Sequence, residues 1–267
     1  MGTGYRLKSS LASALAGAAL AAPAAATGVP AGVLIENSAT ATYTANAVAQ
    51  SVDSNTVTFT VDEVVDVATA SQESGPVAAT TTAVLRFKVT NTGNGPEAFT
   101  LTANPAVTGN AFNATVTGLA IDVNANGIYD AGVDTALTNG ATSPVLAADA
   151  PLDVLVLVSI PASAPANATS RVELTATATT GTGAAGTLFA GAGVSGGDAV
   201  VGATTGAATA QATLTVNKTT VTLAKSATIA DPFGGARPVP QAVITYSTVA
   251  NATGTATATG LAISDAI

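Results

Sequence analysis

The chain of 267 residues lacks cysteine, histidine and tryptophan altogether. Without cysteine it has no disulfide bond, no thiolate nucleophile and no cysteine-ligated metal. Without histidine it lacks the most common general base and the usual zinc ligand. Aromatic residues make up only 4% and charged residues only 9%, where soluble domains typically have roughly 25% charged residues. The sequence therefore offers no visible catalytic machinery, and we expect no enzymatic activity.

Basic residues are scarce as well. Eight lysines and arginines stand against sixteen aspartates and glutamates, which gives a net charge of −8. A negatively charged surface repels nucleic acid and anionic lipid. We therefore expect neither of them as a partner.

The start of the chain has the pattern of a secretory signal peptide. Arg6 and Lys8 form a positive segment, residues 11–20 are an apolar run rich in alanine and leucine, and residues 24–26 are three alanines suited to cleavage. A membrane anchor is the alternative, but so short a run cannot cross roughly 30 Å of hydrocarbon. We expect residues 1–26 to be removed. The mature chain is predicted to have no membrane span and to be secreted or held at a bacterial cell surface.

What the chain does contain is a β-strand composition, because threonine and valine are abundant and both are β-branched. In residues 84–89 apolar and cationic side chains alternate, which predicts that Leu85, Phe87 and Val89 share a buried face. Similar short segments are separated by glycine, proline and asparagine turn signals. The predicted strands are residues 33–44, 56–61, 64–67, 84–89, 99–101, 115–121, 152–160, 172–178, 212–216, 221–225, 243–246 and 258–263.

Short strands without a convincing amphipathic helix after residue 26 indicate an all-β chain built as an antiparallel β-sandwich. A β-solenoid is the alternative, but no fixed short period is present. We divide the chain into an N-terminal β-hairpin (27–63) with a polar turn at residues 46–55, one sandwich (64–217), and the start of a second (218–267). The last segment has too few strands to close two sheets.

Parts of the sequence resemble one family. They are residues 37–43 with 54–61, residues 87–94, and residues 239–246 with 260–265. Together they resemble the conserved-repeat domain of unknown function found in bacterial secreted and surface proteins. The resemblance covers most of residues 30–267, although Gln241 stands where the family usually has glycine. It implies an immunoglobulin-like sandwich followed by an incomplete second sandwich, often arrayed in tandem, with no established enzymatic activity.

In that family the first of these stretches resembles the closing strands of a repeat, and the last resembles an opening. This suggests that residues 33–61 of one molecule complete residues 218–267 of the next by strand addition, giving head-to-tail fibres. A truncated repeat, or the front end of a longer protein, is the alternative explanation of the same pattern.

Residues 122–134 are the one stretch whose spacing implies a specific chemistry, because oxygen-bearing side chains recur at every second position. In a count like that of an EF-hand, the twelfth position is Val133 instead of glutamate, and Asp134 is its nearest substitute. The sequence predicts a calcium site formed by Asp122, Asn124, Asn126, the Ile128 carbonyl, Asp130 and Asp134. The alternative is an ordinary Asn-Gly hairpin turn at Asn126-Gly127, which does not explain three neighbouring aspartates.

Two other patterns are weaker. Residues 181–186 and 191–196 both match the G-x-G-x-x-G dinucleotide fingerprint, but no amphipathic helix follows either match, so a Gly-rich loop is the preferred interpretation. Asp149 and Asp153 are a conceivable acid–base pair, but their separation in sequence says nothing about whether they face each other.

The sequence as a whole predicts a non-enzymatic secreted or cell-surface module with a structural or adhesive role, stabilised by calcium in one loop. Its expected partners are neighbouring surface-protein modules or further copies of the chain. The alternative is an adhesin-type domain that binds a protein or a glycan, but the scarcity of aromatic rings disfavours sugar stacking.

Overall fold

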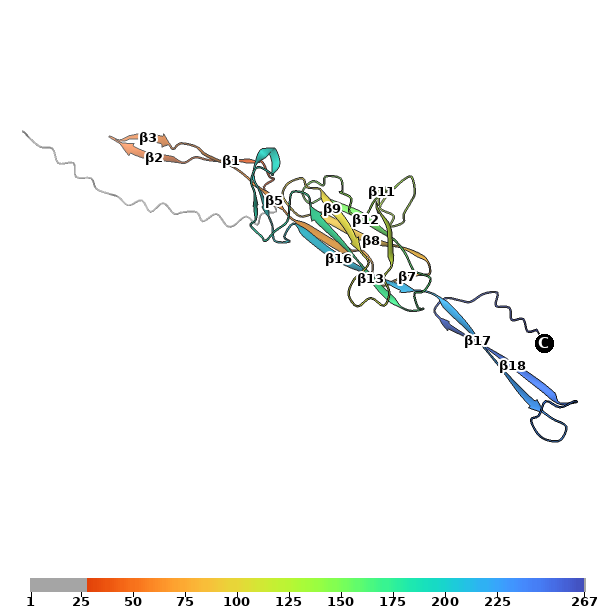
Figure 1. The fold of residues 1–267 in the computed structure, drawn as a ribbon. Helices are drawn as coiled ribbons and strands as arrows, with labels where there is room; N and C mark the ends of the chain where they lie inside the picture. The colour runs from red at the N-terminus through yellow and green to blue at the C-terminus, as the bar shows by residue number, and fades with distance from the viewer. Residues whose placement is uncertain (1–27, 267) are drawn as a thin grey trace, which may run out of the picture.

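The computed structural model describes residues 28–266, and the predicted signal peptide, residues 1–26, lies outside them. The described residues contain β-strands and one short 3₁₀ helix, η1 (Val194–Gly196), but no α-helix. The prediction of an all-β chain is therefore confirmed. Figure 1 shows an elongated molecule, with a sandwich in the middle and one two-stranded ribbon extending from each end.

The central sandwich consists of two sheets. The first has the strand order β11 (Thr135–Leu137), β10 (Thr115–Ile121), β12 (Pro151–Ser159), β8 (Thr82–Asn91) and β6 (Val67–Ser71). The second has the order β7 (Val77–Ala79), β16 (Ala207–Val216), β13 (Thr169–Ala178) and β9 (Phe99–Asn104). All neighbours are antiparallel except β7, which runs parallel to β16.

This strand order is that of an immunoglobulin-like sandwich. β6, β8, β12 and β10 occupy the places of strands A, B, E and D, while β9, β13 and β16 occupy those of C, F and G. β7 is a second part of strand A that has crossed to the other sheet. The predicted immunoglobulin-like fold is therefore confirmed, and the β-solenoid alternative is excluded.

The core lies between the two sheets and follows the alternation of the strands. Leu85, Phe87 and Val89 are fully buried, as their spacing predicts. Phe99 from β9 and Leu214 from β16 lie in the same cluster from the opposite sheet. Because aromatic residues are scarce, valine, leucine and alanine fill most of the remaining space.

The N-terminal ribbon is one long hairpin rather than two short strands around a polar turn. β1 (Leu34–Asn37) pairs with β4 (Val57–Thr60), and β2 (Thr40–Ala45) pairs with β3 (Val48–Asp53). The predicted turn over residues 46–55 is thus wrong. Asn46 and Ala47 alone reverse the chain, both with positive φ, as a two-residue type I′ turn requires.

The C-terminal ribbon contains two strands that are longer than predicted. β17 (Thr219–Ala230) pairs with β18 (Val243–Gly254) along their whole length. The strand predicted for residues 258–263 is wrong, since these residues form no strand. Among the described residues β17 and β18 pair only with each other, so no third strand is added to this ribbon.

A small third sheet closes the end of the sandwich next to the N-terminal ribbon. β15 (Ala199–Val201) lies between β14 (Leu188–Phe189), which is antiparallel to it, and β5 (Glu63–Val65), which is parallel. Within the Gly-rich stretch 181–197 only Leu188–Phe189 belong to this sheet, so most of the stretch is a loop, as predicted. Across residues 28–266, no helix is sufficiently long and apolar to span a bilayer.

Asn91 at the end of β8 ties two turns to the sandwich from a fully buried position. Its amide nitrogen donates to the carbonyl oxygens of Gly95 at 2.8 Å, Leu146 at 2.9 Å and Ala147 at 3.2 Å. Its amide oxygen accepts from the Gly93 nitrogen at 3.0 Å. Buried polar groups are costly to leave without a partner, so these bonds fix the turn that follows β8.

We expect Asn91→Ala to lower the free energy of unfolding by about 3 kcal/mol, because it leaves several buried main-chain groups unpaired. Urea unfolding followed by circular dichroism measures the loss. The control is Asn55→Ala in the exposed ribbon, which should change stability by less than about 0.5 kcal/mol. Equal effects of the two substitutions would contradict the structural role of Asn91.

Candidate functional site

The predicted cation loop, residues 122–134, connects two paired strands. β10 ends at Ile121, β11 begins at Thr135, and these two residues face each other in the ladder. The loop is therefore closed at its neck by the sheet and extends from the edge of the sandwich. An ordinary two-residue Asn-Gly hairpin is excluded, because the strands stop well before Asn126 and Gly127.

Two buried carboxylates organise the neck. Asp122 is only 8% exposed and accepts hydrogen bonds from the main-chain nitrogens of Asn126 at 3.2 Å and Gly127 at 2.7 Å. Asp134 is only 7% exposed and accepts from the nitrogens of Val123 at 3.1 Å and Asp130 at 2.7 Å. Both aspartates thereby fold the main chain of the loop around themselves.

The middle of the loop brings three more predicted ligands together. The amide nitrogens of Asn124 and Asn126 both donate to Oδ2 of Asp130, at 3.0 and 2.7 Å. These hydrogen bonds hold the pKa of the Asp130 carboxyl below its usual value, and the bond from Asn124 has the larger effect. The sixth predicted contributor, Ile128, donates its main-chain nitrogen to Oδ1 of Asn126, and its side chain is exposed.

Gly127 is needed for two physical reasons. Its φ is +74°, which L side chains rarely adopt, and a Cβ placed there would lie 2.8 Å from Cδ of Arg86. Arg86 is held in this place by Glu73, to which its Nε and Nη2 donate at 3.0 and 2.9 Å. Since Glu73 neutralises the guanidinium, the positive charge next to the loop is compensated.

The oxygen atoms of this loop suit a hard cation of the calcium type, which accepts carboxylate, amide and main-chain oxygens alike. Within residues 28–266 no three acidic side chains lie close enough to hold a metal ion by themselves. A cation would therefore need amide oxygens as well as carboxylates. Both amide groups meet at Asp130. Rotating the amides of Asn124 and Asn126 by half a turn would direct their oxygen atoms, instead of their nitrogen atoms, to this point.

Two buried glutamates, Glu63 and Glu97, were not predicted from the sequence. Glu63 and Glu97 are each only 4% exposed. Burial, and then the charge of Glu97, raise the pKa of Glu63 above its usual value. Oε1 of Glu97 accepts from the nitrogen and the hydroxyl of Thr179, at 3.2 and 2.7 Å, whereas its buried Oε2 has no hydrogen-bond partner among the described residues. The two residues are 34 positions apart on different elements, so no local spacing signalled them.

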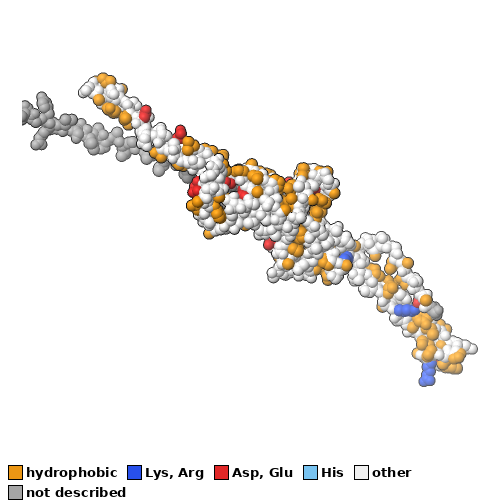
Figure 2. Space-filling model, turned by 45° about the horizontal axis from the view of Figure 1, so that its top comes forward, with side chains coloured by type: hydrophobic (Ala, Val, Ile, Leu, Met, Phe, Trp, Pro, Cys, Tyr) orange, Lys and Arg blue, Asp and Glu red, His pale blue; other side chains and the backbone are white. Residues whose placement is uncertain are grey.

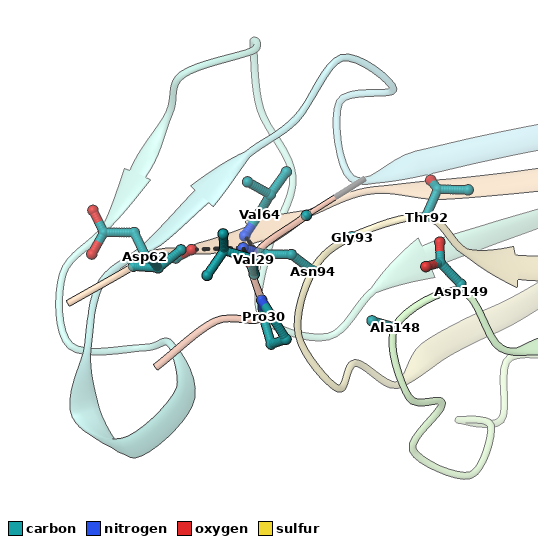
Figure 3. A pocket seen from close by; sticks show the side chains of 11 residues that line it. Val29, Pro30, Asp62, Val64, Thr92, Gly93, Asn94, Ala148 and Asp149 are labelled. Atoms are coloured by element: carbon teal, nitrogen blue, oxygen red, sulfur yellow. Dashed lines mark hydrogen bonds between the residues drawn. The ribbon is translucent and has the colours of Figure 1, made fainter. Parts of the chain in front are cut away.

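A cavity of about 580 Å³ lies where the N-terminal ribbon joins the sandwich (Figure 3). Asn94 crosses it, donating to the carbonyl oxygens of Val29 at 3.2 Å and Asp62 at 3.0 Å. Its amide oxygen accepts from the nitrogen of Val64 at 2.6 Å. The Asn94 side chain is thus engaged with the chain itself, and this place acts as a joint that fastens the ribbon.

The weaker patterns of the sequence do not form sites. Asp153 is in contact with Gln72 and Lys88, at 2.6 and 3.7 Å, while Asp149 lies in a turn with positive φ beside the cavity. The G-x-G-x-x-G matches are followed only by short strands and by η1. The helix N-terminus on which a dinucleotide fingerprint depends is therefore missing from the described residues.

No protein-family model matches the chain, and no curated protein sequence matches it. Among solved structures, it is similar to native alpha-2-macroglobulin from Escherichia coli, spanning the residues from domain MG7 to the C-terminus. That similarity has 14% identity and a TM-score of 0.26, and it covers 62% of this chain and 19% of that chain.

A second similar structure is Escherichia coli alpha-2-macroglobulin activated by porcine elastase. Here the identity is 13% and the TM-score 0.23, over 73% of this chain and 13% of that chain. The chain thus spans 19% or less of the length of these two chains. Because both scores are low, the immunoglobulin-like assignment depends on the strand order described above.

The raised pKa of Glu63 has a consequence for stability. A carboxyl whose pKa is raised by folding favours the folded state below its usual pKa, and this contribution is lost as the pH rises through the raised pKa. We expect Glu63→Gln to stabilise the protein at pH 7 by about 1 kcal/mol, since one of two repelling buried charges is removed.

The measurement is urea unfolding of the wild type and Glu63→Gln at a series of pH values. The advantage of the variant should shrink as the pH falls through the raised pKa of Glu63. It should be gone below the usual value of 4.5, where the wild-type carboxyl is protonated in the folded and the unfolded chain. Exposed Glu36 supplies the control, since Glu36→Gln should show no comparable gain. A loss of stability in Glu63→Gln of the same size at every pH would contradict the prediction.

Proposed function

We propose that the chain is a non-enzymatic structural module of a bacterial secreted or cell-surface protein, one unit in a row of immunoglobulin-like sandwiches. The observation that supports this proposal is the shortness of the connections between the central sandwich and the two ribbons. β16 ends at Val216 and β17 begins at Thr219, so only two residues separate the central sandwich from the next ribbon. β4 and β5 are likewise separated only by Val61 and Asp62.

Side-chain anchors at both junctions support a row of fixed units. At the N-terminal junction, Asn94 binds the main chain on both sides of the joint. At the C-terminal junction, the ammonium group of Lys218 donates to the carbonyl oxygens of Ala162 at 2.7 Å and Ala164 at 3.1 Å. Such short, bonded connections hold neighbouring units at a set orientation, which suits a spacer or stalk better than a flexible linker.

We further propose that residues 122–134 bind calcium and thereby stiffen the edge of the sandwich. Asp122, Asn124, Asn126 and Asp130 are linked by hydrogen bonds, with Asp134 at the neck. With few carboxylates and no bidentate glutamate, the expected affinity is that of extracellular modules, with a Kd of roughly 10⁻⁴–10⁻³ M.

An adhesive role for a protein or glycan ligand is the second candidate. The exposed aromatic side chains that favour it, Tyr43, Phe59, Phe233 and Tyr246, lie on the two ribbons and not around one pocket. A glycan array or a pull-down that returned one specific ligand for the sandwich would favour this candidate over a purely structural role.

We expect a saturating millimolar concentration of calcium to raise the melting temperature by about 5 °C, because binding to the folded state alone stabilises it by mass action. Differential scanning calorimetry with calcium, and with magnesium for comparison, measures the shift. Asp122→Ala should abolish the shift.

Because Asp122 also accepts main-chain hydrogen bonds, its replacement alone leaves a structural explanation open. Asp130→Asn keeps the shape of a half-buried side chain and should reduce the shift as well, whereas Asp149→Ala, outside the loop, should retain it. A wild-type melting temperature unchanged by millimolar calcium would remove the site.

A further inference from the structure

The N-terminal ribbon exposes an apolar face that nothing in the described chain covers. Ile35 and Phe59 are paired across β1 and β4, and Val57 follows on the same side. Phe59 is 56% and Val57 57% exposed. An isolated two-stranded ribbon is marginal in water, so this face calls for a second layer.

The C-terminal ribbon has the same property. On one face of β17 and β18, apolar side chains predominate, whereas the opposite face carries mostly threonine, serine and asparagine. The apolar face contains Val221, Leu223, Ala227, Ile229, Ile244, Tyr246, Ala250 and Ala252. Its one charged residue is Lys225, which lies 4.7 Å from the centre of the Tyr246 ring and pairs with Asp265.

The C-terminal ribbon repeats the first strand pair of the sandwich, β6 with β8, in sequence and in register. β18 begins Val-Ile-Thr-Tyr where β8 has Val-Leu-Arg-Phe. Tyr246 is paired with Ala227, as Phe87 is paired with Ser71. Four residues further along β18, Ala250 is paired with Leu223, as Asn91 is paired with Val67. The exposed apolar face of this ribbon is thus the face that is buried in the sandwich.

The N-terminal ribbon repeats the last strand pair, β13 with β16. β4 and the residue after it read Val-Thr-Phe-Thr-Val, where β16 ends Ala-Thr-Leu-Thr-Val. Phe59 takes the place of Leu214, and Ile35, its partner, takes the place of Ser170. Both Leu214 and Ser170 are buried against the opposite sheet.

In the sandwich these two strand pairs cover each other. Phe87 and Leu214 are fully buried members of one cluster, and β6 packs against β13 and β16. Each ribbon is therefore one layer of a two-layer unit whose other layer is the opposite ribbon. Figure 1 places the ribbons at opposite ends of the molecule, so they cannot meet within one chain.

The charges of the two ribbons favour pairing of an N-terminal ribbon with a C-terminal one. Residues 28–63 carry Glu36, Asp53, Asp62 and Glu63 and no basic residue. Residues 218–267 carry Lys218, Lys225 and Arg237 against Asp231 and Asp265. Figure 2 shows acidic side chains towards the N-terminal ribbon and basic ones on the C-terminal ribbon. Two N-terminal ribbons repel each other, whereas an N-terminal and a C-terminal ribbon attract.

We propose that the N-terminal ribbon of one molecule packs on the C-terminal ribbon of a second copy, so that Phe59 and Val57 cover Ile244 and Tyr246. This interface is heterologous and does not close, so copies add head to tail into filaments. The inference deepens the proposed structural role and depends on it, since it names the partner of the exposed ribbons.

One further feature fits this arrangement. Pro76-Val77 of the sandwich corresponds to Pro238-Val239, ahead of β8 and β18 respectively. Val77 begins β7, which exists because β16 lies beside it. Residues 236–239 form no strand in the single chain, as expected when the neighbouring strand comes from another molecule. In the filament they add to β4 of the second copy by strand addition.

The test uses residues 27–267, which omit the predicted signal peptide, in four variants. Phe59→Asp and Ile244→Asp each place a charge on one apolar face. Thr58→Asp and Thr245→Asp place the same charge on the opposite faces of the same strands. Sedimentation velocity over a wide concentration range measures assembly, and circular dichroism and thermal melting verify that the central sandwich is folded in every variant.

We expect the wild type and both threonine variants to form a series of oligomers that grows with concentration. Phe59→Asp and Ile244→Asp should each remain monomeric. Their mixture should form dimers and nothing larger, because Phe59→Asp retains an intact C-terminal ribbon and Ile244→Asp an intact N-terminal one.

Three results would overturn the inference. A wild type that is monomeric at every concentration would mean that something other than a second copy covers the ribbons. Dimers of Phe59→Asp alone would mean that like ribbons pair. Loss of assembly in Thr245→Asp, whose cross-strand partner is the uncharged Thr228, would mean that the apolar face is not the contact. None of these results touches the structural role itself, which would fail instead if the wild type turned over a substrate.

Discussion

The two-layer requirement of amphipathic β-structure governs this molecule. A strand pair with one apolar face is stable in water only when a second layer covers that face. The central sandwich meets the requirement, because Phe87 of one sheet and Leu214 of the other lie in one buried cluster. The two ribbons have the same alternation and the same pairing register, but each presents its apolar face uncovered. The central sandwich therefore covers its own apolar faces, whereas each ribbon needs a further layer from outside the chain.

The buried polar side chains differ in how completely they are hydrogen-bonded. Asn91 and the aspartates of residues 122–134 are enclosed by main-chain donors and acceptors, so each fixes the shape of a turn. The pair of Glu63 and Glu97 is less well compensated, since two like charges share a buried place and one oxygen has no partner. Gly95 leaves room for the Glu63 side chain, because a Cβ at this position would lie 2.6 Å from Cδ of Glu63. Glu63 begins β5, where the N-terminal ribbon enters the sandwich, so this imperfectly compensated charge lies at the junction.

Much of the fold could be predicted because alternation is a local property. The strand at residues 115–121 and the buried face of Leu85, Phe87 and Val89 follow directly from the residue pattern. Short strands such as β7, β11 and β15 could not be predicted, since they exist only through a neighbour distant in sequence. The same reasoning applies to the candidate loop and the glutamates. The spacing of oxygen-bearing side chains identified residues 122–134, whereas the burial of Glu63 and Glu97 depends on how separate parts of the chain pack.

The parallel pairing of β7 with β16 determines how the sandwich responds to mechanical load. In a row of units, tension along the long axis pulls the beginning of the sandwich one way and its end the other. β7 and β16 run in the same direction and lie side by side, so that tension slides them along each other instead of separating them from one end. All hydrogen bonds of the ladder then carry the force together and must break together. β5 and β15 repeat this geometry at the other end of the sandwich, so the unit resists stretching by shear at two places.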